Sequence, residues 1–215
     1  MFELYKEDLA TIKDRDPAAR SSLEIVLCYP GFKAVRAYRR AHKHFLKGHF
    51  LRARLISQRC AYKTGIEIHP GATIGKRFFI DHGHGVVIGE TTEIGDDVTI
   101  YQGVTLGGTG KECGKRHPTI GNNVMIGAGA KLLGSFKVGD NTRIAAGSVV
   151  LSSVPANSTA VGSPARVVRN NGHSVLELDQ VHIPDPVSRE LRKLHKKIDR
   201  LEKELKTSKE HQKEE

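Results

Sequence analysis

An aliphatic residue recurs every six positions through the middle of the chain, and this spacing limits the folds that the chain can adopt. The recurrence is broken twice, by a shift of two residues after Ile80 and by a longer gap after Leu106. Glycine follows the aliphatic residue in seven of the thirteen cases. The thirteen positions are Ile68, Ile74, Ile80, Ile88, Ile94, Ile100, Leu106, Ile120, Ile126, Leu132, Val138, Ile144 and Val150.

A fixed six-residue repeat matches neither the helical period nor simple strand alternation, and it is typical of a parallel β-helix. Each hexapeptide makes one short strand and one corner, so three of them complete a triangular coil with the aliphatic residues pointing inward. Gly and Asn near the corners accept the positive φ angles that tight turns need. We therefore predict a mainly β protein with additional helices, built on a left-handed parallel β-helix. The hand is that of known hexapeptide prisms, an exception to the right-handed crossover rule.

The longer gap, at residues 107–119, predicts a loop that projects from a corner. Leu106 and Ile120 are 14 residues apart, which is one hexapeptide plus eight residues that have no place in the core. Long loops in compact domains usually have a function. The loop is rich in glycine, but Gly114-Lys115 is followed by Arg116, so the nucleotide-binding pattern GxxxxGK[ST] is absent.

Residues 1–65 have the periodicity of helices. Two helices are predicted in the second half of this segment, ending at Gly48 and at Gly65. Asp16, directly before Pro17, is interpreted as a helix N-cap. The predicted inward positions are Phe32, Val35, Tyr38, His42 and Phe45 in the first helix and Leu51, Leu55 and Ile56 in the second.

Residues 171–215 are predicted to form a linker and a C-terminal helix. Between Leu191 and Leu205, leucine or isoleucine recurs at steps of three and four, which is a short coiled-coil seam. In that register Lys197 faces Glu202 of a parallel partner, which favours self-association. The alternative is an amphipathic helix that lies on its own domain. The predicted domains are 1–65, 66–170 with the loop 107–119, and 171–215.

The formal net charge of +10 is concentrated between Glu24 and Glu67, where ten Lys or Arg residues occur and no acidic residue does. Such a stretch is compatible with a surface for nucleic acid or an anionic membrane. No nucleic-acid motif or aromatic platform accompanies it, so a pair of helices with a solvated basic face is the favoured interpretation.

Cysteine usage and hydropathy indicate a cytoplasmic protein. The three cysteines are far apart and show no zinc-binding spacing, so we expect reduced thiols. The first residues are too charged for a signal peptide. No apolar run approaches 18 residues, so no membrane span is expected.

A few charged residues stand out among the repeats as candidates for chemistry. His82 can take a proton from a hydroxyl if a carboxylate fixes its tautomer, and Glu67, on another face of the same coil, is the candidate partner. Whether the two meet within one chain is left open by the sequence. Arg116 can hold a carboxylate in a bidentate fork, while Asp16 and Asp81 can pair with an ammonium group. Together they predict a site for a hydroxyl-bearing amino acid.

Other polar residues have plainer interpretations. His69, before Pro70, and His84 are expected to occupy corners of the prism. Cys113 lies in the glycine-rich loop, but nothing near it in the sequence marks its thiol as activated.

The chain resembles the serine O-acetyltransferases, hexapeptide acyltransferases that open cysteine biosynthesis. The resemblance covers roughly residues 10–170, and the combination of DHGxG with GGTGKxxGxRHP is far more specific than the repeats alone. The stretches that carry it are RDPAA, GIEIHPGATIG, FIDHGHGVVIGE, QGVTLGGTGKECGKRHPTIG, VMIGAGAKLLGS, IAAGSVVL and VGSPARVV.

The resemblance implies transfer of the acetyl group of acetyl-CoA to the hydroxyl of L-serine, giving O-acetyl-L-serine and CoA, without a metal. It implies that His82 is the general base, Glu67 its carboxylate partner and His117 a second histidine at the hydroxyl. Family members assemble as trimers with active sites between adjacent prisms, and the loop would reach over that cleft. The implied serine-binding residues are Asp16, Asp81 and Arg116, and the implied CoA-binding residues are Gly108, Thr109, Ala128, Ala146 and Arg166.

The chain departs from the family pattern in three places. Glu67 stands where well-studied members have Asp. The chain begins close to RDPAA, without the larger helical region that joins trimers into hexamers, so a short-form homotrimer is expected. It ends in Glu214-Glu215, whereas members that dock into cysteine synthase end in isoleucine, so docking into that partner is not expected.

Three alternatives remain open from the residues. The first is a hexapeptide acetyltransferase that acts on a sugar or an antibiotic. The second is a zinc prism similar to the γ-carbonic anhydrases, with His82, His84 and His117 as ligands, although Asn122 stands where that family has a further histidine. The third is a non-catalytic basic trimer that presents its N-terminal helices to anions.

Overall fold

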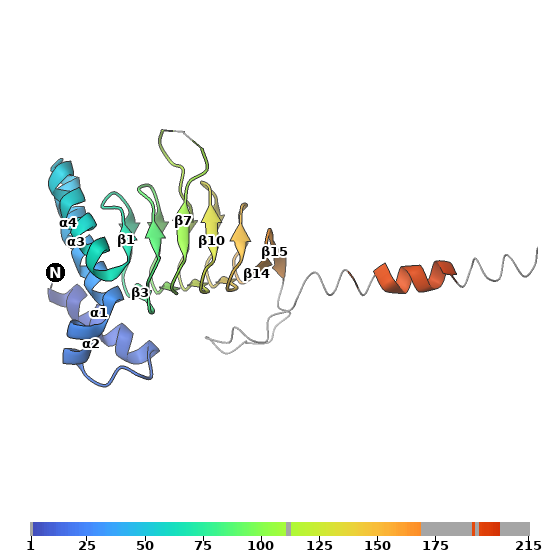
Figure 1. Cartoon of the computed structure of the whole chain (residues 1–215), viewed down its shortest axis with the longest axis horizontal. Helices are drawn as coiled ribbons and strands as arrows, with labels where there is room; N and C mark the ends of the chain where they lie inside the picture. The colour runs from blue at the N-terminus through green and yellow to red at the C-terminus, as the bar shows by residue number, and fades with distance from the viewer. Residues whose placement is uncertain (1, 111–112, 169–190, 192–193, 203–215) are drawn as a thin grey trace, which may run out of the picture. The chain divides into compact units, whose positions relative to one another are not determined.

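The structure, a computed structural model, describes residues 2–110, 113–168, 191 and 194–202. The chain divides into two compact units, Met1–Ile183 and Pro184–Glu215. The first unit holds helices followed by a prism of short strands (Figure 1). Its helices are α1 (Phe2–Arg15), α2 (Ser22–Cys28), α3 (Pro30–Leu46) and α4 (Phe50–Thr64).

The prism has three parallel sheets, and consecutive strands along the chain pass from one sheet to the next. Sheet A contains, in spatial order, β1 (Glu67–Ile68), β4 (Val87–Ile88), β7 (Thr105–Gly107), β10 (Lys131–Leu133) and β13 (Val149–Val150). Sheet B contains β2 (Thr73–Ile74), β5 (Glu93–Ile94), β8 (Thr119–Ile120) and β11 (Lys137–Val138). Sheet C contains β3 (Phe79–Ile80), β6 (Thr99–Ile100), β9 (Met125–Ile126), β12 (Arg143–Ile144), β14 (Thr159–Gly162) and β15 (Ala165–Val168), the last pair antiparallel. The predicted parallel β-helix is therefore confirmed.

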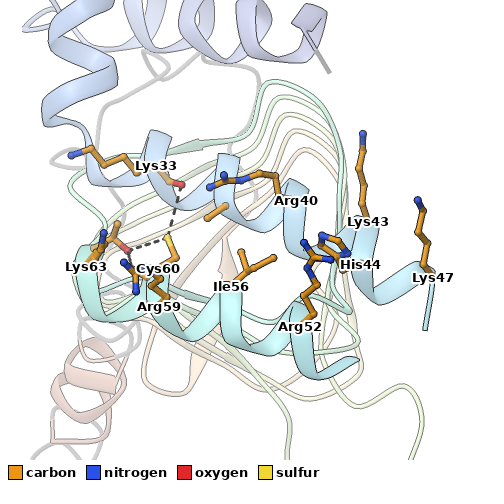
Figure 2. A pocket seen from close by; sticks show the side chains of 12 residues that line it. Lys33, Arg40, Lys43, His44, Lys47, Arg52, Ile56, Arg59, Cys60 and Lys63 are labelled. Atoms are coloured by element: carbon orange, nitrogen blue, oxygen red, sulfur yellow. Dashed lines mark hydrogen bonds between the residues drawn. The ribbon is translucent and has the colours of Figure 1, made fainter. Parts of the chain in front are cut away.

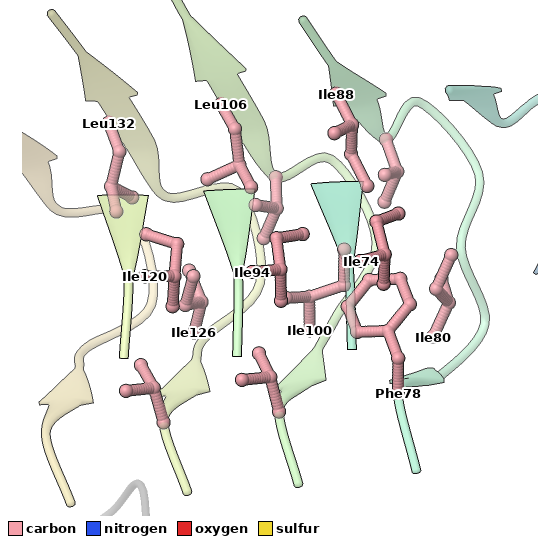
Figure 3. Close-up of a cluster of buried hydrophobic side chains, with 14 of the residues drawn as sticks. Ile74, Phe78, Ile80, Ile88, Ile94, Ile100, Leu106, Ile120, Ile126 and Leu132 are labelled. Atoms are coloured by element: carbon pink, nitrogen blue, oxygen red, sulfur yellow. The ribbon is translucent and has the colours of Figure 1, made fainter. Parts of the chain in front are cut away.

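The aliphatic residues of the six-residue repeat form the core of the prism (Figure 3). All thirteen predicted inward positions are buried. The register stacks them directly, so that Ile88 lies opposite Ile68 on one side and Leu106 on the other. Each isoleucine of an inner coil is thus covered by the coils on both sides, and burial of such a side chain contributes about 1.5–3 kcal/mol.

Three of the five corners after sheet B use asparagine, as the sequence predicted, and the other two have Arg77 and Asp97 at the same place, also with positive φ. Asn123, Asn141 and Asn157 have φ angles of 52°, 56° and 54°. Their side chains also form a ladder along the prism, because Asn123 Nδ2 donates to Asn141 Oδ1 at 2.9 Å and Asn141 Nδ2 donates to Asn157 Oδ1 at 3.0 Å. The longer gap in the repeat leaves the prism between β7 and β8 as the projecting loop that was predicted (Figure 1).

Helices α3 and α4 pack on each other and on the first coil of the prism. The Tyr38 hydroxyl donates to the Ala72 carbonyl at 2.6 Å, and the Ser57 hydroxyl donates to the Ile68 carbonyl at 2.7 Å. These bonds satisfy backbone acceptors on the first coil, which otherwise has no coil before it. The helix ends were predicted well, since α3 stops two residues before Gly48 and α4 stops directly before Gly65.

The predicted inward face of α4 was wrong. Leu51 is 75% exposed and Leu55 is 62% exposed, and the residues of α4 that are buried are Ala53, Ser57 and Thr64. The reason is distance: small side chains let the helix axis approach the prism closely enough for the Ser57 hydroxyl to reach a strand carbonyl.

The interpretation of Asp16 as a helix cap was also wrong. Helix α1 ends at Arg15, before Pro17, and the next helix begins only at Ser22. Asp16 instead accepts a hydrogen bond from the Ala18 amide at 2.8 Å within a turn. The cap of α2 is Ser21, whose hydroxyl accepts from the Glu24 amide at 3.1 Å.

In the second unit, residues 194–202 are helical, as predicted. Leu191, Leu194, Ile198 and Leu201 are each exposed by 51–54%, and Leu205 lies outside the described residues. Self-association through this seam stays a prediction. Among the described residues, no helix has the length and apolar character needed to cross a membrane.

We predict that Gly31→Ala destabilises the protein, although alanine is the better helix former by about 1 kcal/mol. A Cβ on Gly31, in the first turn of α3, would overlap the backbone carbonyl oxygen of Ile80. Forcing the helix and the strand apart should lower the unfolding free energy by about 1–3 kcal/mol, measured by urea denaturation. Lys33→Ala, on the exposed side of the same helix, is the control. Equal stability of Gly31→Ala and wild type would contradict the close packing.

Candidate active site

The predicted site residues gather at the two opposite ends of the strands of sheet A. His82 lies in the corner that leads from β3 into β4, whereas Arg116 lies in the loop that leaves the end of β7. We call the group around His82 the entry cluster and the group around Arg116 the exit cluster. One chain by itself therefore brings its predicted base and its predicted carboxylate clamp to different edges of the prism.

The entry cluster contains Asp16, Tyr29, Asp81, His82 and Tyr101. His82 Nε2 lies 3.9 Å from Asp81 Oδ1, and the His82 side chain is 76% exposed. The Tyr29 hydroxyl donates to Asp16 Oδ2 at 2.7 Å. Because the other Asp16 oxygen accepts from the Ala18 amide, two bonds orient this carboxylate. His82 has a φ of 56°, so its backbone turns the imidazole outward at the corner.

The charges of the entry cluster act on one another. Burial raises the pKa of Asp81, the nearby Asp16 carboxylate raises it further, and His82 opposes both effects. Burial, followed by the hydrogen bond to Asp16, raises the pKa of Tyr29 to about 12, so this hydroxyl remains a donor. Two carboxylates held within electrostatic range of each other favour a cation between them. The arrangement suits an ammonium group.

The exit cluster is built around Thr91. Its hydroxyl oxygen accepts from the backbone amides of Arg116 at 3.0 Å and His117 at 3.2 Å, and it lies 2.9 Å from His117 Nδ1. The Arg116 guanidinium forms an ion pair with Glu90. His117 is buried against Gly89, where any Cβ would overlap the imidazole. The exit of the loop is therefore fixed to the preceding coil.

Glu67 begins β1 and lies opposite Val87, which begins β4, the strand that the His82 corner leads into, whereas His69 follows β1 at its exit end. His69 Nδ1 accepts from the Gly71 amide at 3.0 Å, which is the corner role predicted for this residue. Burial lowers the pKa of His69, and its charged neighbours include Arg54, Glu90, Arg116 and Glu67. In the described part of the chain no hydrogen bond joins Glu67 to His82. The Glu67–His82 dyad therefore stays a prediction.

The residues implied to bind CoA are divided in the same way. Gly108 and Thr109 are exposed in the loop at the exit end. Ala128 and Ala146 lie at the entry end, on adjacent coils, where the Gly147 amide donates to the Ala128 carbonyl at 2.8 Å. Arg166 is exposed on β15, opposite Val161 of β14.

The geometry also bears on the zinc alternative. His82 and His117 belong to different ends of sheet A, so the three proposed imidazoles do not converge within one chain. Among residues 2–110, 113–168, 191 and 194–202, no group of three His, Cys, Asp or Glu side chains is arranged to hold a metal ion.

Four residues of these clusters, Tyr29, Glu90, Thr91 and Tyr101, were not found from the sequence. Tyr29 orients Asp16, Glu90 pairs with Arg116, and Thr91 fixes the loop exit. Glu90 and Thr91 occupy an ordinary corner of the repeat, and their neighbours in space are 25 or 26 residues away along the chain. Only the way in which coils stack could have located them.

Comparisons with known proteins agree with the fold and with these motifs. Residues 1–37 match the family "Serine acetyltransferase, N-terminal", and residues 117–152 match "Bacterial transferase hexapeptide (six repeats)". The serine acetyltransferase of Bacillus subtilis is 56% identical over 210 residues, which cover 97% of each chain. The serine acetyltransferase of Staphylococcus aureus strain N315 is 53% identical over 201 residues, covering 93% of this chain and 94% of that protein.

Solved structures give the same result. The structure of Neisseria gonorrhoeae serine acetyltransferase in complex with serine matches with a TM-score of 0.75 and 43% identity, covering 78% of this chain and 68% of that one. The Brucella abortus serine acetyltransferase in complex with coenzyme A matches with a TM-score of 0.77 and 44% identity, covering 80% of this chain and 69% of that one.

We predict that His117 titrates below the ordinary histidine pKa of about 6.5. Burial disfavours its charged form, and the positive charge of Arg116 lowers the pKa further. The pKa can be measured by NMR titration of the imidazole protons. Arg116→Gln removes the neighbouring cation and leaves the Glu90 charge uncompensated, so it should raise the His117 pKa. A wild-type pKa at or above the ordinary value would contradict the buried position.

Proposed function

The chain belongs to the serine acetyltransferase family, and we propose that its active site forms between two subunits, with His82 as the general base. The enzyme transfers the acetyl group of acetyl-CoA to the hydroxyl of L-serine, giving O-acetyl-L-serine and CoA, the first step of cysteine biosynthesis. The observation that supports a shared site is the separation of the entry and exit clusters at opposite ends of sheet A.

In the proposed site, serine is held by its charged ends. Asp16 and Asp81 of one subunit take the ammonium group, and Tyr29 is a positioning residue that holds Asp16. Arg116 of the neighbouring subunit takes the carboxylate in a bidentate fork. The serine hydroxyl is then directed toward His82, and the 76% exposure of that side chain leaves it open to a partner subunit.

The proposed reaction is a direct transfer. His82 removes the hydroxyl proton as the serine oxygen attacks the thioester carbonyl, and the C–S bond then breaks as the imidazolium returns the proton to the departing sulfur. Glu67 would fix the His82 tautomer, and His117 of the neighbouring subunit would lie at the same hydroxyl. Backbone N–H groups would stabilise the oxyanion.

We propose a cytoplasmic homotrimer as the working form. Acetyl-CoA would lie between subunits, against the loop residues Gly108 and Thr109 of one chain and the corners at Ala128 and Ala146 of the next, with Arg166 nearby. All three cysteines are free, which suits a reducing compartment. In a cyclic trimer each chain uses its entry cluster in one site and its exit cluster in another.

We predict that His82→Ala lowers kcat by about 10²–10⁴-fold and changes acetyl-CoA binding little. The measurement is thiol release from acetyl-CoA, with L-serine, D-serine, homoserine and a sugar compared side by side. His84→Ala, two residues away in the same corner, is the matched control and should keep its activity. Near-normal turnover of His82→Ala would exclude the base role, and strong acetylation of the sugar without acetylation of serine would exclude the proposed acceptor.

A second prediction tests the shared site. His82→Ala and Arg116→Ala chains should each be nearly inactive, but co-expressed chains should regain activity. Every mixed trimer then contains one site with an intact His82 and an intact Arg116, so random assembly restores about a quarter of the wild-type sites. A mixture of the two separately purified variants is the control. No recovery in verified mixed trimers would mean that the two residues act within one chain.

A further inference from the structure

A groove outside the proposed active site runs between α3 and α4 (Figure 2). It encloses a cavity of ≈ 650 Å³, a volume in the range of small-molecule sites. Its floor contains Ala37, Ile56, Cys60 and Thr64. The rest of its lining is basic and comprises Lys33, Arg40, Lys43, His44, Lys47, Arg52, Arg59 and Lys63.

The cations of the groove have no acidic partners in the described part of the chain. No Asp or Glu occurs between Glu24 and Glu67. Among the described residues, no carboxylate forms an ion pair with any lysine or arginine of the groove, and Lys33 donates to a backbone carbonyl, that of Leu27, at 2.5 Å.

Several arginines outside the groove have carboxylate partners. Arg39 bonds to Asp8, and both Arg15 and Arg77 bond to Asp97. The lysines and arginines of the groove have none among the described residues, and their uncompensated positive charge lowers the stability of the free protein.

His44, which lines the groove, has an unsatisfied ring nitrogen. Its Nδ1 atom is buried and has no hydrogen-bond partner among the described residues. Desolvation lowers the pKa of His44, and the nearby positive charge of Arg52 lowers it further. Figure 2 shows Arg52 of α4 extending toward His44 of α3. Farther along the groove, the charges of Arg40 and Lys63 both act on Cys60. Cations from both helices thus line one open groove.

We propose that the groove between α3 and α4 binds a small soluble anion that carries two or more phosphate groups. Guanidinium groups bind phosphate through two parallel hydrogen bonds, and ammonium groups add point charges. The cations extend along the groove from Lys33 to Lys47 on α3, so one singly charged ion would leave most of them without a partner. A ligand of this kind would also supply an acceptor for protonated His44.

The test is isothermal titration calorimetry of the full-length protein with inorganic tripolyphosphate, at an ionic strength held constant with chloride. We expect saturable binding by the wild type and weaker binding of monophosphate. Arg40→Gln/Arg52→Gln should weaken binding of tripolyphosphate by tenfold or more, since a hydrogen bond to a charged group contributes about 1.5–3 kcal/mol. The charge-matched control is Lys76→Gln/Lys137→Gln, which alters exposed lysines on the prism and should change the affinity less than about twofold.

The readouts separate a specific groove from general attraction to a basic protein. In the wild type, the NMR signals of His44 should shift with tripolyphosphate and reach saturation with the calorimetric affinity. Absence of binding, or equal weakening by both double variants, would overturn the proposal. Binding to anionic phospholipid vesicles or to a DNA duplex without binding to tripolyphosphate would also overturn it.

Discussion

Parallel stacking of the aliphatic residues determines where the functional groups of the prism lie. Because Ile88 packs between Ile68 and Leu106, each corner of one coil lies over the same corner of the next. Residues that are 16 to 26 positions apart in the chain therefore become neighbours along an edge, as Asn123 and Asn141 do. The residues that the repeat places along an edge determine the chemistry of that edge, and the prism holds these residues at a fixed spacing.

This geometry explains why the entry and exit clusters remain apart in one chain. Both flank sheet A, and a short rigid strand cannot bend to bring its two ends together. In the exit cluster, Arg116 must also leave Glu90 in order to bind a substrate carboxylate, because the two side chains form an ion pair in the free protein. The side chains of that pair are 29% and 36% exposed, and such pairs contribute about 0–1 kcal/mol. The pair can therefore orient the guanidinium without competing strongly with serine.

The sequence was sufficient for the parts of the fold that depend on a period. The inward positions from Ile68 to Val150, the projecting loop and the ends of α3 and α4 follow from local patterns, and the structure confirms them. The sequence was insufficient where the packing of one element against another decided which residues are buried or hydrogen-bonded. The hydrophobic positions of α4 predicted burial of Leu51 and Leu55, but the contact with the prism requires small residues such as Ser57. Similarly, the position of Asp16 before a proline suggested a cap, whereas its hydrogen bond to Tyr29 depends on the packing of α1, α2 and α3.

The α3–α4 groove and the entry cluster share a structural element, although they are separate sites. Helix α3 provides half of the groove. In its first turn, Gly31 contacts the backbone carbonyl of Ile80, which is the residue directly before Asp81. A ligand that draws α3 and α4 together thus acts on the helix that touches the strand leading into His82. If occupancy of the groove changes the affinity for serine, serine must change the affinity of the groove by the same factor, because the coupling free energy is reciprocal. Measurement of either affinity at a saturating concentration of the other ligand therefore determines the coupling.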